Sequence, residues 1–226
     1  MAKTKQKGNA LIYVMTGIFM AILCVAVSIA LLTVPYEKAQ TYLNIIFMNQ
    51  ERFTADQGLV ITENENISTD LPSGDMEEAG EIIRPSFGEQ YAVLRCEAAQ
   101  IEVPVYWGSS AELLDLGACQ SSASTVLGET GNAVIDAHVN TFFANLTQIE
   151  PGDEIVLFTE YGVFIYTARE QITFQNTDKR YILPTETDQL TLYTCEAQVL
   201  GTSTTRVGVV CDLKSKLFYP GEGAAE

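Results

Sequence analysis

The sequence predicts an all-β domain, a barrel or sandwich with short helices, preceded by an N-terminal membrane helix. Two observations lead to this prediction. Short runs of β-forming residues, separated by turn residues, begin near Tyr91 and continue to about Cys211. A nearly uninterrupted apolar segment, residues 10–34, lies close to the N-terminus. Many short strands with turns between them are typical of a barrel or sandwich, and 226 residues suffice for one such domain with additions.

The charge and composition of the chain exclude several classes of function. Lys and Arg total 13 against 29 Asp and Glu, which gives a net charge of −16. A nucleic-acid-binding protein needs a basic surface, so this class is excluded. Because 47% of the residues are hydrophobic and only 19% are charged, the chain as a whole is not intrinsically disordered. The single histidine excludes any mechanism that requires two imidazoles.

Residues 10–34 are long enough to cross a membrane. At about 1.5 Å per residue, a helix of this length reaches roughly 37 Å, and a bilayer's hydrocarbon core is about 30 Å thick. Lysines precede the segment and an acidic chain follows it, so the positive-inside rule places residues 1–9 in the cytoplasm. The alternative is a cleaved signal peptide, but its apolar region is shorter and residues 31–35 form a poor cleavage site. We therefore expect a single-pass protein of the cell membrane with an extracellular domain.

Residues 35–89 are predicted to form an acidic stem and a flexible linker. The first part, to about residue 56, has a mixed pattern that could continue the membrane helix. Residues 62–80 are rich in Asp and Glu and hold few large apolar groups, so they cannot bury enough surface to order themselves. The folded domain is therefore placed at 90–219, followed by a short tail at 220–226.

Each element of the folded domain is predicted from a local pattern. The clearest hairpin has its turn at 160–162. A short helix is expected over 111–119, ending at Gly117, and a helical turn over 141–149. The predicted strands, about seven or eight in all, are built from 91–94, 102–107, 133–137, 154–159, 163–174, 190–194 and 206–211.

The cysteines are predicted to play different roles. Cys24 is a small apolar residue of the membrane segment, and Cys211 is a buried residue of an apolar strand. If one exported thiol stays free, the other three permit at most one disulfide. Cys96 with Cys119 is one such pair, but sequence alone cannot decide the connectivity.

Three residues at the ends of predicted strands are candidates for catalysis. Cys195 ends the run 190–194 and precedes a loop of polar and small residues, a position that favours access over packing. Arg206 opens the next strand, so this loop can return it beside Cys195. His138 follows the strand 133–137. Taken alone, a histidine at a strand end is more simply interpreted as buried or incidental.

Ordered motifs around these residues resemble those of the sortase family. Thr191-Leu192-Tyr193-Thr194-Cys195 matches the Thr-Leu-x-Thr-Cys motif of sortases in full, and Arg206 stands at their arginine position. The segment 131–138, followed by Phe143, Leu146 and 151–155, is similar to their histidine region. Residues 103–108 resemble the segment before the first short helix of sortases. The resemblance spans about 91–213.

This resemblance implies a closed eight-stranded β-barrel and a cysteine transpeptidase of Gram-positive surfaces. Such enzymes cleave a C-terminal sorting signal, often of the Leu-Pro-x-Thr-Gly (LPXTG) type, and join the new carboxyl group to an amine of the cell-wall precursor or of a pilin. The expected partners are surface proteins that carry this signal, an amine acceptor, and the membrane through the N-terminal helix. No nucleic acid is expected.

Some features depart from the pattern of particular sortase classes. Ala137-His138-Val139 stands where sortases often have Gly-His-Arg. This difference leaves the sortase subclass undecided but does not affect the proposed catalytic chemistry. No second membrane segment and no Asp-Pro-aromatic lid are recognised, which argues against the pilus-polymerising class. The stretch 174–190 is too short for the long helical insertion of the heme-protein-anchoring class. A single-anchor sortase of the housekeeping or sporulation-associated type is the remaining expectation.

Residue chemistry supports the roles that the resemblance implies. The Cys195 thiolate would be the nucleophile that attacks the peptide carbonyl. His138 would first be the general acid for the leaving amine and then the base for the incoming amine. Arg206 would stabilise the tetrahedral oxyanion, with the backbone N–H of Glu196 as a second donor.

Residues that bind the peptide or a metal are less clearly indicated. The loops 174–190 and 196–205 should wall the peptide groove. No metal or other cofactor is expected, and ordinary loop carboxylates are the favoured interpretation of the acidic residues near the groove. They could nevertheless form part of a calcium site, because some sortases use acidic residues in this region. The candidate peptide contacts are Thr194, Glu196, Leu183 and Val199, and the candidate calcium ligands are Asp178, Glu186 and Asp188.

Two other functions remain open at this point. One is a cysteine endopeptidase on the same fold, in which water replaces the acceptor amine. The other is a membrane-tethered β-domain that binds a surface ligand without chemistry.

Overall fold

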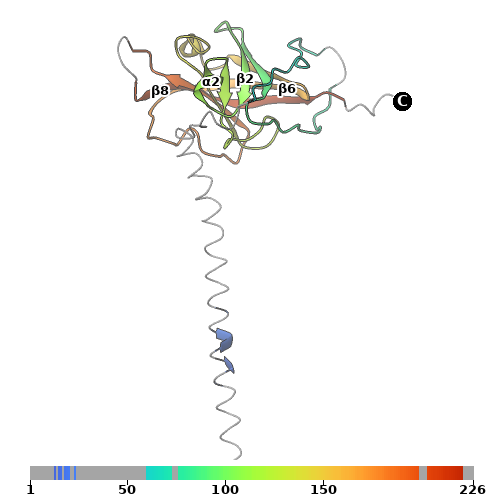
Figure 1. Cartoon of the computed structure of the whole chain (residues 1–226), viewed down its shortest axis with the longest axis vertical. Helices are drawn as coiled ribbons and strands as arrows, with labels where there is room; N and C mark the ends of the chain where they lie inside the picture. Colours follow the sequence, from blue (N-terminus) through green and yellow to red (C-terminus); the bar gives the residue numbers. More distant parts are fainter. Residues whose placement is uncertain are drawn as a thin grey trace, which may run out of the picture. The chain divides into compact units, whose positions relative to one another are not determined.

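The computed structural model describes residues 13, 15, 16, 18–20, 23, 60–72, 76–198 and 203–220. The chain divides into two compact units, residues 1–46 and 47–226, and the second contains the barrel (Figure 1). Within the described residues, none of the helices has the length and apolar character needed to cross a bilayer. Most of the predicted membrane helix 10–34, Cys24 included, lies outside the described residues, so this helix stays a prediction.

Among the described residues, eight strands close into one barrel, which confirms the predicted all-β fold. Around the barrel the strand order is β1-β2-β3-β4-β7-β8-β6-β5, and β5 pairs back with β1. Two short helical elements accompany the strands, α2 (Ala111–Leu114) and η2 (Leu146–Gln148). The strands are β1 (Gln90–Cys96), β2 (Ile101–Trp107), β3 (Ala118–Gln120), β4 (Asn132–Asp136), β5 (Glu154–Thr159), β6 (Gly162–Gln175), β7 (Gln189–Cys195) and β8 (Thr205–Phe218).

The helix predicted over 111–119 is shorter than expected. It ends at Leu114, and the chain turns through Gly117 into β3, which pairs in parallel with β2. The Ser110 hydroxyl accepts the backbone N–H of Leu113 and so caps the start of α2. The reason for the early end is that residues 118–120 form a buried strand of the barrel, where pairing with β2 and β4 satisfies backbone polar groups.

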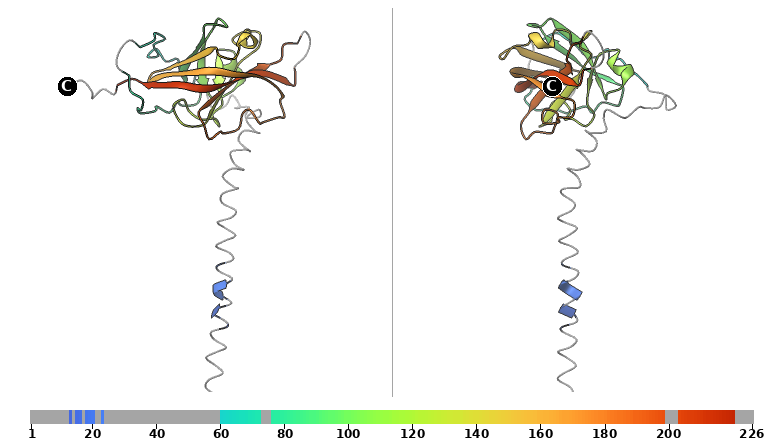
Figure 2. Two further views of the ribbon diagram at one scale, coloured as in Figure 1. Left: turned by 180° about the vertical axis from the view of Figure 1, so that it is seen from behind. Right: turned by 90° about the vertical axis from the view of Figure 1, so that its left-hand side faces the viewer.

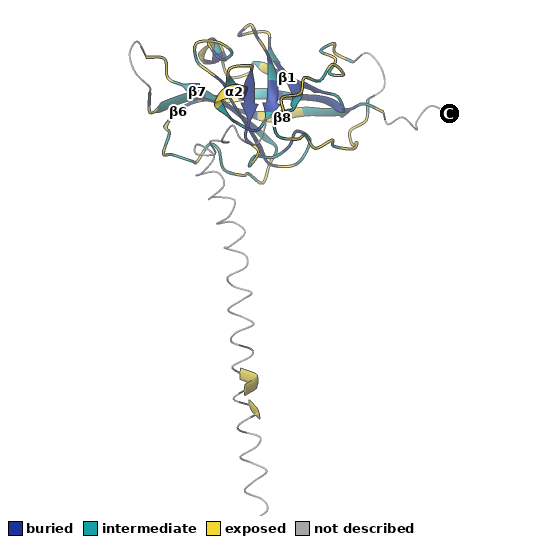
Figure 3. Cartoon of the chain, viewed as in Figure 1, coloured by how far each residue is buried: buried dark blue, intermediate teal, exposed yellow. Residues whose placement is uncertain are grey.

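The hydrophobic core lies inside the barrel. It explains why inward-facing buried residues alternate with outward-facing residues along the strands. β6 and β8 run side by side as the two longest strands (Figure 2), with 14 residues each. Buried residues concentrate in the strands and exposed residues in the loops (Figure 3). Leu190 and Leu192 of β7 point into this core, and each buried side chain of this size contributes about 1.5–3 kcal/mol to folding. Alternation then places Tyr193 and Cys195 on the outer side of the barrel.

Pairing of β4, β7 and β8 determines where the candidate residues lie. β4 and β7 are parallel, with Asp136 opposite Tyr193, so the carboxyl ends of both strands reach the same edge. β7 and β8 are antiparallel, with Cys195 opposite Arg206. Gly208 is required in this pairing, because a Cβ atom there would lie 2.2 Å from the Leu192 carbonyl oxygen.

The described part of the predicted linker 35–89 departs from a flexible chain. Thr62 forms a parallel bridge with Glu89, and Glu77 forms an antiparallel bridge with Phe218 at the end of β8. The Arg95 guanidinium donates to the Thr69 carbonyl at 2.9 Å. The composition of the segment does not reveal this order, because the partners of Thr69 and Glu77 belong to the barrel and the partner of Thr62, Glu89, directly precedes β1. The outer domain boundaries stay predictions, and residues 221–226 of the predicted tail lie outside the described residues.

The four cysteines that the structure describes, Cys96, Cys119, Cys195 and Cys211, are all free. The disulfide considered between Cys96 and Cys119 is therefore not formed. The reason is that Cys96 lies in the main core, whereas Cys119 packs in a separate cluster with Tyr106 and Leu113. Cys211 is fully buried in β8, as predicted, and burial raises the pKa of its thiol.

Candidate active site

The three predicted catalytic residues line one cavity of about 190 Å³. Cys195 is the last residue of β7, and Arg206 faces it across the β7–β8 pairing. His138 lies two residues beyond the end of β4, and the parallel register of Asp136 with Tyr193, continued by two residues, carries it toward Cys195. A thiol, an imidazole and a guanidinium therefore meet at one edge of the barrel.

Thr194 holds the ends of β7 and β4 together. Its hydroxyl donates to the Ala137 carbonyl at 2.7 Å, directly between Cys195 and His138 in the fold. Thr194 is only 2% exposed but lines the cavity, so its predicted contact with peptide stays a prediction. Its hydroxyl is donated to the Ala137 carbonyl, and this bond fixes the spacing of the two strand ends.

His138 is the most exposed of the three candidates. Its backbone carbonyl accepts the N–H of Phe143 at 3.1 Å, and Phe143 is buried in the core, so the loop after β4 is anchored close to the imidazole. The Nε2 atom lies 3.7 Å from Oδ1 of Asp115, which follows α2. Because both side chains are exposed, this contact, which is an ion pair only when His138 is protonated, contributes at most about 1 kcal/mol.

Arg206 has unused donors. Its Nη1 donates to the carbonyls of Ser203 at 2.9 Å and Thr205 at 3.2 Å. Within the described residues, Nε and Nη2 have no hydrogen-bond partner, so both can bind an anionic oxygen. These bonds hold the first residues of β8 beside the end of β7.

The expected second oxyanion donor is contradicted by the structure. The backbone N–H of Glu196 donates to the Thr205 carbonyl at 3.0 Å, because the β7–β8 pairing continues for one residue beyond Cys195. The Glu196 side chain is also engaged, since it accepts the Ser203 hydroxyl at 3.3 Å. An oxyanion on a substrate bound at Cys195 would therefore depend on Arg206 rather than on Glu196.

Residues away from the three candidates also line the cavity. The β6–β7 loop supplies Lys179 and Ile182, and Ser109 and Leu114, the last residue of α2, line it as well. Leu183, predicted to contact peptide, does not line the cavity; its carbonyl accepts the Asn132 amide at 3.1 Å. Val199, the remaining predicted contact, lies outside the described residues.

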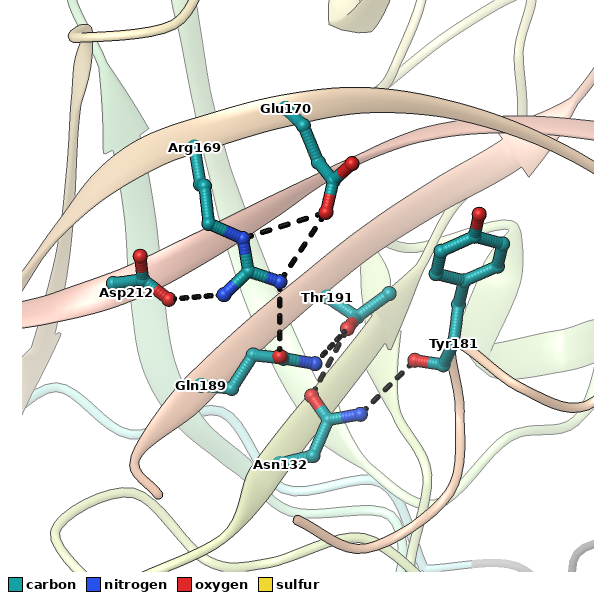
Figure 4. A network of polar contacts seen from close by, with 7 residues as sticks. All are labelled: Asn132, Arg169, Glu170, Tyr181, Gln189, Thr191 and Asp212. Atoms are coloured by element: carbon teal, nitrogen blue, oxygen red, sulfur yellow. Dashed lines mark hydrogen bonds and ion pairs between the residues drawn. The ribbon is translucent and has the colours of Figure 1, made fainter. Parts of the chain in front are cut away.

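Asn132 of β4 holds the β6–β7 loop in place through hydrogen bonds (Figure 4). Its amide nitrogen donates to the carbonyl of Tyr181 at 3.0 Å as well as to that of Leu183. Its amide oxygen accepts the Thr191 hydroxyl at 3.0 Å, and Gln189 extends this network toward the surface. Asn132 is 1% exposed, so both loop carbonyls would lose a buried partner without it.

Replacing Asn132 with alanine is expected to raise the KM for a cleaved peptide by about 5- to 20-fold, with a smaller change in kcat. The reason is that the loop wall moves while Cys195 and its strand stay in place. Steady-state kinetics on Asn132→Ala measures both constants. Gln189→Ala is the matched control, because Gln189 belongs to the same network but does not contact the loop carbonyls. A fall in kcat at constant KM would contradict this positioning role.

Asp136 is a residue of the site that sequence reasoning missed. Ala133 and Ile135 belong to the core, so alternation places Asp136 on the outer side of β4, where it lines the cavity. Burial raises the pKa of its carboxyl from 3.8 to about 7, although nearby Arg206 opposes this rise. A lone carboxylate within the apolar run 133–137 was the available signal.

Replacing Asp136 with asparagine is expected to stabilise the protein at pH 8 but hardly at pH 4. The pKa of this carboxyl is higher in the folded than in the unfolded protein. Its ionisation therefore lowers the free energy of unfolding progressively as pH rises from about 4 to 7, and the full loss persists above pH 7. The full shift corresponds to about 4 kcal/mol, and for a half-buried group we expect about 2 kcal/mol. Thermal unfolding at both pH values measures the difference, with the exposed Glu186→Gln as control. A stability difference that does not change with pH would refute this account.

Two of the three candidate calcium ligands have other partners. Asp178 pairs with Arg180 at 2.6 Å, and Asp188 pairs with Lys216 at 3.0 Å. Glu186 is exposed. In the part of the chain that the structure describes, no three potential ligands form a cluster suited to a metal ion. Metal dependence stays untested.

Comparisons with known proteins agree with this geometry. A family model described as the sortase domain matches residues 94–214, more than half of the chain. Sortase D of Bacillus subtilis (strain 168) is 27% identical over 113 residues, which cover 50% of this chain and 57% of that protein. The chain therefore spans less than two thirds of the length of this curated relative.

Solved structures show the same barrel. Sortase E from Streptomyces avermitilis has a TM-score of 0.53 at 25% identity, and the match covers 63% of this chain and 97% of that one. Sortase A of Listeria monocytogenes has a TM-score of 0.52 at 23% identity, covering 58% and 92%. The similarity to sortase A of Listeria monocytogenes shows a shared fold and nothing more. Since the matched family domain contains the whole β4–β7–β8 edge with its cysteine, histidine and arginine, the chain belongs to the sortase family.

Proposed function

We propose that this protein is a membrane-anchored extracellular transpeptidase. It cleaves an LPXTG-like C-terminal sorting signal through a thioacyl intermediate on Cys195 and transfers the protein to a cell-wall amine. The observation that supports this most strongly is the meeting of Cys195, His138 and Arg206 around one accessible cavity. Membership in the sortase family supports the same chemistry.

In the first half-reaction, the Cys195 thiolate attacks the carbonyl carbon of the scissile bond. The Nε and Nη2 donors of Arg206, which have no hydrogen-bond partner among the described residues, stabilise the resulting oxyanion. As the intermediate collapses, the C–N bond breaks, and protonated His138 gives its proton to the leaving amine. The acyl half of the peptide remains bound to sulfur as a thioester.

In the second half-reaction, an acceptor amine attacks the thioester carbon. Neutral His138 removes the proton from this amine, and Arg206 again stabilises the oxyanion. The C–S bond then breaks, the thiolate is restored and a new amide bond is formed. Attack by water would give a free carboxylate instead, so the outcome depends on which nucleophile reaches the thioester first.

Membrane attachment is part of the proposal. The apolar residues 10–34 would cross the bilayer once, with residues 1–9 in the cytoplasm and the barrel outside the cell. The partners are surface proteins that carry the sorting signal and an amine of the cell-wall precursor. Such placement keeps the enzyme next to substrates that emerge from the same membrane.

The proposed function is tested by incubating the full chain with a fluorogenic LPXTG peptide, with and without an amine acceptor. A ligated product that depends on the acceptor is expected. Hydrolysed product alone, whatever acceptor is offered, would identify an endopeptidase. No cleavage, together with unchanged cellular activity of Cys195→Ala, would identify a binding domain without chemistry.

A further inference from the structure

A second cation besides Arg206 lines the cavity. Lys179 lies on the β6–β7 loop, is half-buried, and within the described residues its ammonium has no hydrogen bond or ion pair. Burial lowers the pKa of this ammonium, and the positive charge of Arg206 lowers it further. Two like charges held at one cavity repel each other, and a bound anion would relieve this repulsion.

The acidic residues at the cavity do not neutralise these two cations. Asp178 is bound by Arg180 through contacts of 3.0 and 2.6 Å. Asp136 lies on β4 near Arg206, and its carboxyl has a pKa of about 7, so near neutral pH it carries only part of a negative charge. The cavity therefore keeps excess positive charge in a chain whose net charge is −16. This contrast indicates a site for an anionic group.

We propose that Lys179 forms a carboxylate subsite in the peptide groove and selects sorting signals with Glu or Asp close to the scissile bond. This inference rests on the proposed transpeptidase function. Arg206 is needed for the oxyanion, so Lys179 is the cation left for a substrate side chain. An extended peptide rises about 3.3 Å per residue, so the X position of LPXTG, one residue before the Thr that acylates Cys195, would lie close to the cavity that Lys179 and Cys195 both line.

The carboxylate could belong to the sorting peptide or to the acceptor beside its amine. We assign it to the sorting peptide, because Ile182 of the same loop and Phe174 near the end of β6 also line the cavity and give it an apolar wall for a peptide. Hydrolysis without acceptor depends only on the peptide, whereas transfer depends on both partners. The two sources can therefore be separated by measuring the two reactions independently.

The experiment compares LPXTG peptides with Glu, Gln or Lys at X. For the full wild-type chain, kcat/KM for hydrolysis is expected to be about 5-fold higher with Glu than with Gln, and lowest with Lys. Lys179→Met should remove the preference, and Lys179→Glu should reverse it. Lys214→Glu is the matched control: it changes the net charge equally, on an exposed residue of β8 that pairs with Glu154 outside the cavity.

Peptide binding to Cys195→Ala, followed by fluorescence anisotropy, separates the two proposals. If the ratio of kcat/KM for the Glu peptide to that for the Lys peptide is the same in wild type and Lys179→Glu, the proposed subsite is refuted, whereas the proposed transpeptidase function still stands. Charge-selective binding that depends on Lys179, without cleavage by wild type, would support the subsite and overturn the transpeptidase. A preference that appears only with carboxylate-bearing acceptors would overturn the assignment to the sorting peptide.

Discussion

Replacing Cys195 with alanine is expected to lower peptide cleavage by about 10⁴-fold or more. No other group on the described cavity wall can form the thioester, because the remaining described cysteines, Cys96, Cys119 and Cys211, are buried and do not line it. Burial also raises the pKa of these three thiols, which lowers their thiolate fraction. Initial rates with the fluorogenic peptide measure the loss.

Cys211→Ala is the matched control for this prediction. Cys211 lies in the same sheet, on β8, but its side chain is fully enclosed by the core. The variant is expected to lose stability through the cavity it creates and to keep its activity per folded molecule. Equal losses of activity in the two variants would show that the effect of Cys195→Ala is structural rather than chemical.

Replacing Arg206 with alanine is expected to lower kcat by about 10²- to 10³-fold, the loss typical of removing an oxyanion donor. The structure makes this residue especially important, because the Glu196 N–H is already bonded to Thr205. Arg206→Lys should recover little of the activity. One ammonium cannot both hold the Ser203 and Thr205 carbonyls and present separate donors to the oxyanion.

The kinetic pattern distinguishes an oxyanion role from general charge attraction. An oxyanion donor acts in the transition state, so kcat should fall much more than KM rises. Arg169→Ala provides the comparison, because Arg169 pairs with Asp212 away from the cavity (Figure 4). Full activity of Arg206→Lys would contradict the role assigned here.

Much of the barrel could be predicted from local sequence, but its pairing could not. The strand 154–159 coincides with β5 because its β-forming run is bounded by clear turns. β3 was missed because three residues after Gly117 are too few to show a period. β8 was predicted to end at Cys211 but continues to Phe218 through alternating polar and apolar residues. The parallel β4–β7 pairing joins distant segments, so no local pattern could reveal it.

For the candidate site, too, local motifs could be recognised in the sequence, whereas features that depend on long-range pairing could not. Cys195, His138 and Arg206 were found because short motifs mark them. Whether the Glu196 N–H is free or hydrogen-bonded depends on how far the β7–β8 pairing extends. The sequence motif does not reveal this extent. Lys179 was missed because it lies in a polar loop without a recognisable motif, and only the folded chain brings it to the cavity.

Mass spectrometry of the acyl-enzyme tests the central claim most directly. The full chain, mixed with an LPXTG peptide and quenched in acid without acceptor, is expected to gain the mass of the peptide's acyl half. Fragmentation should place this mass on Cys195, and hydroxylamine should remove it, as expected for a thioester. Cleavage of the peptide with no adduct on Cys195, or with the adduct on another residue, would contradict the account.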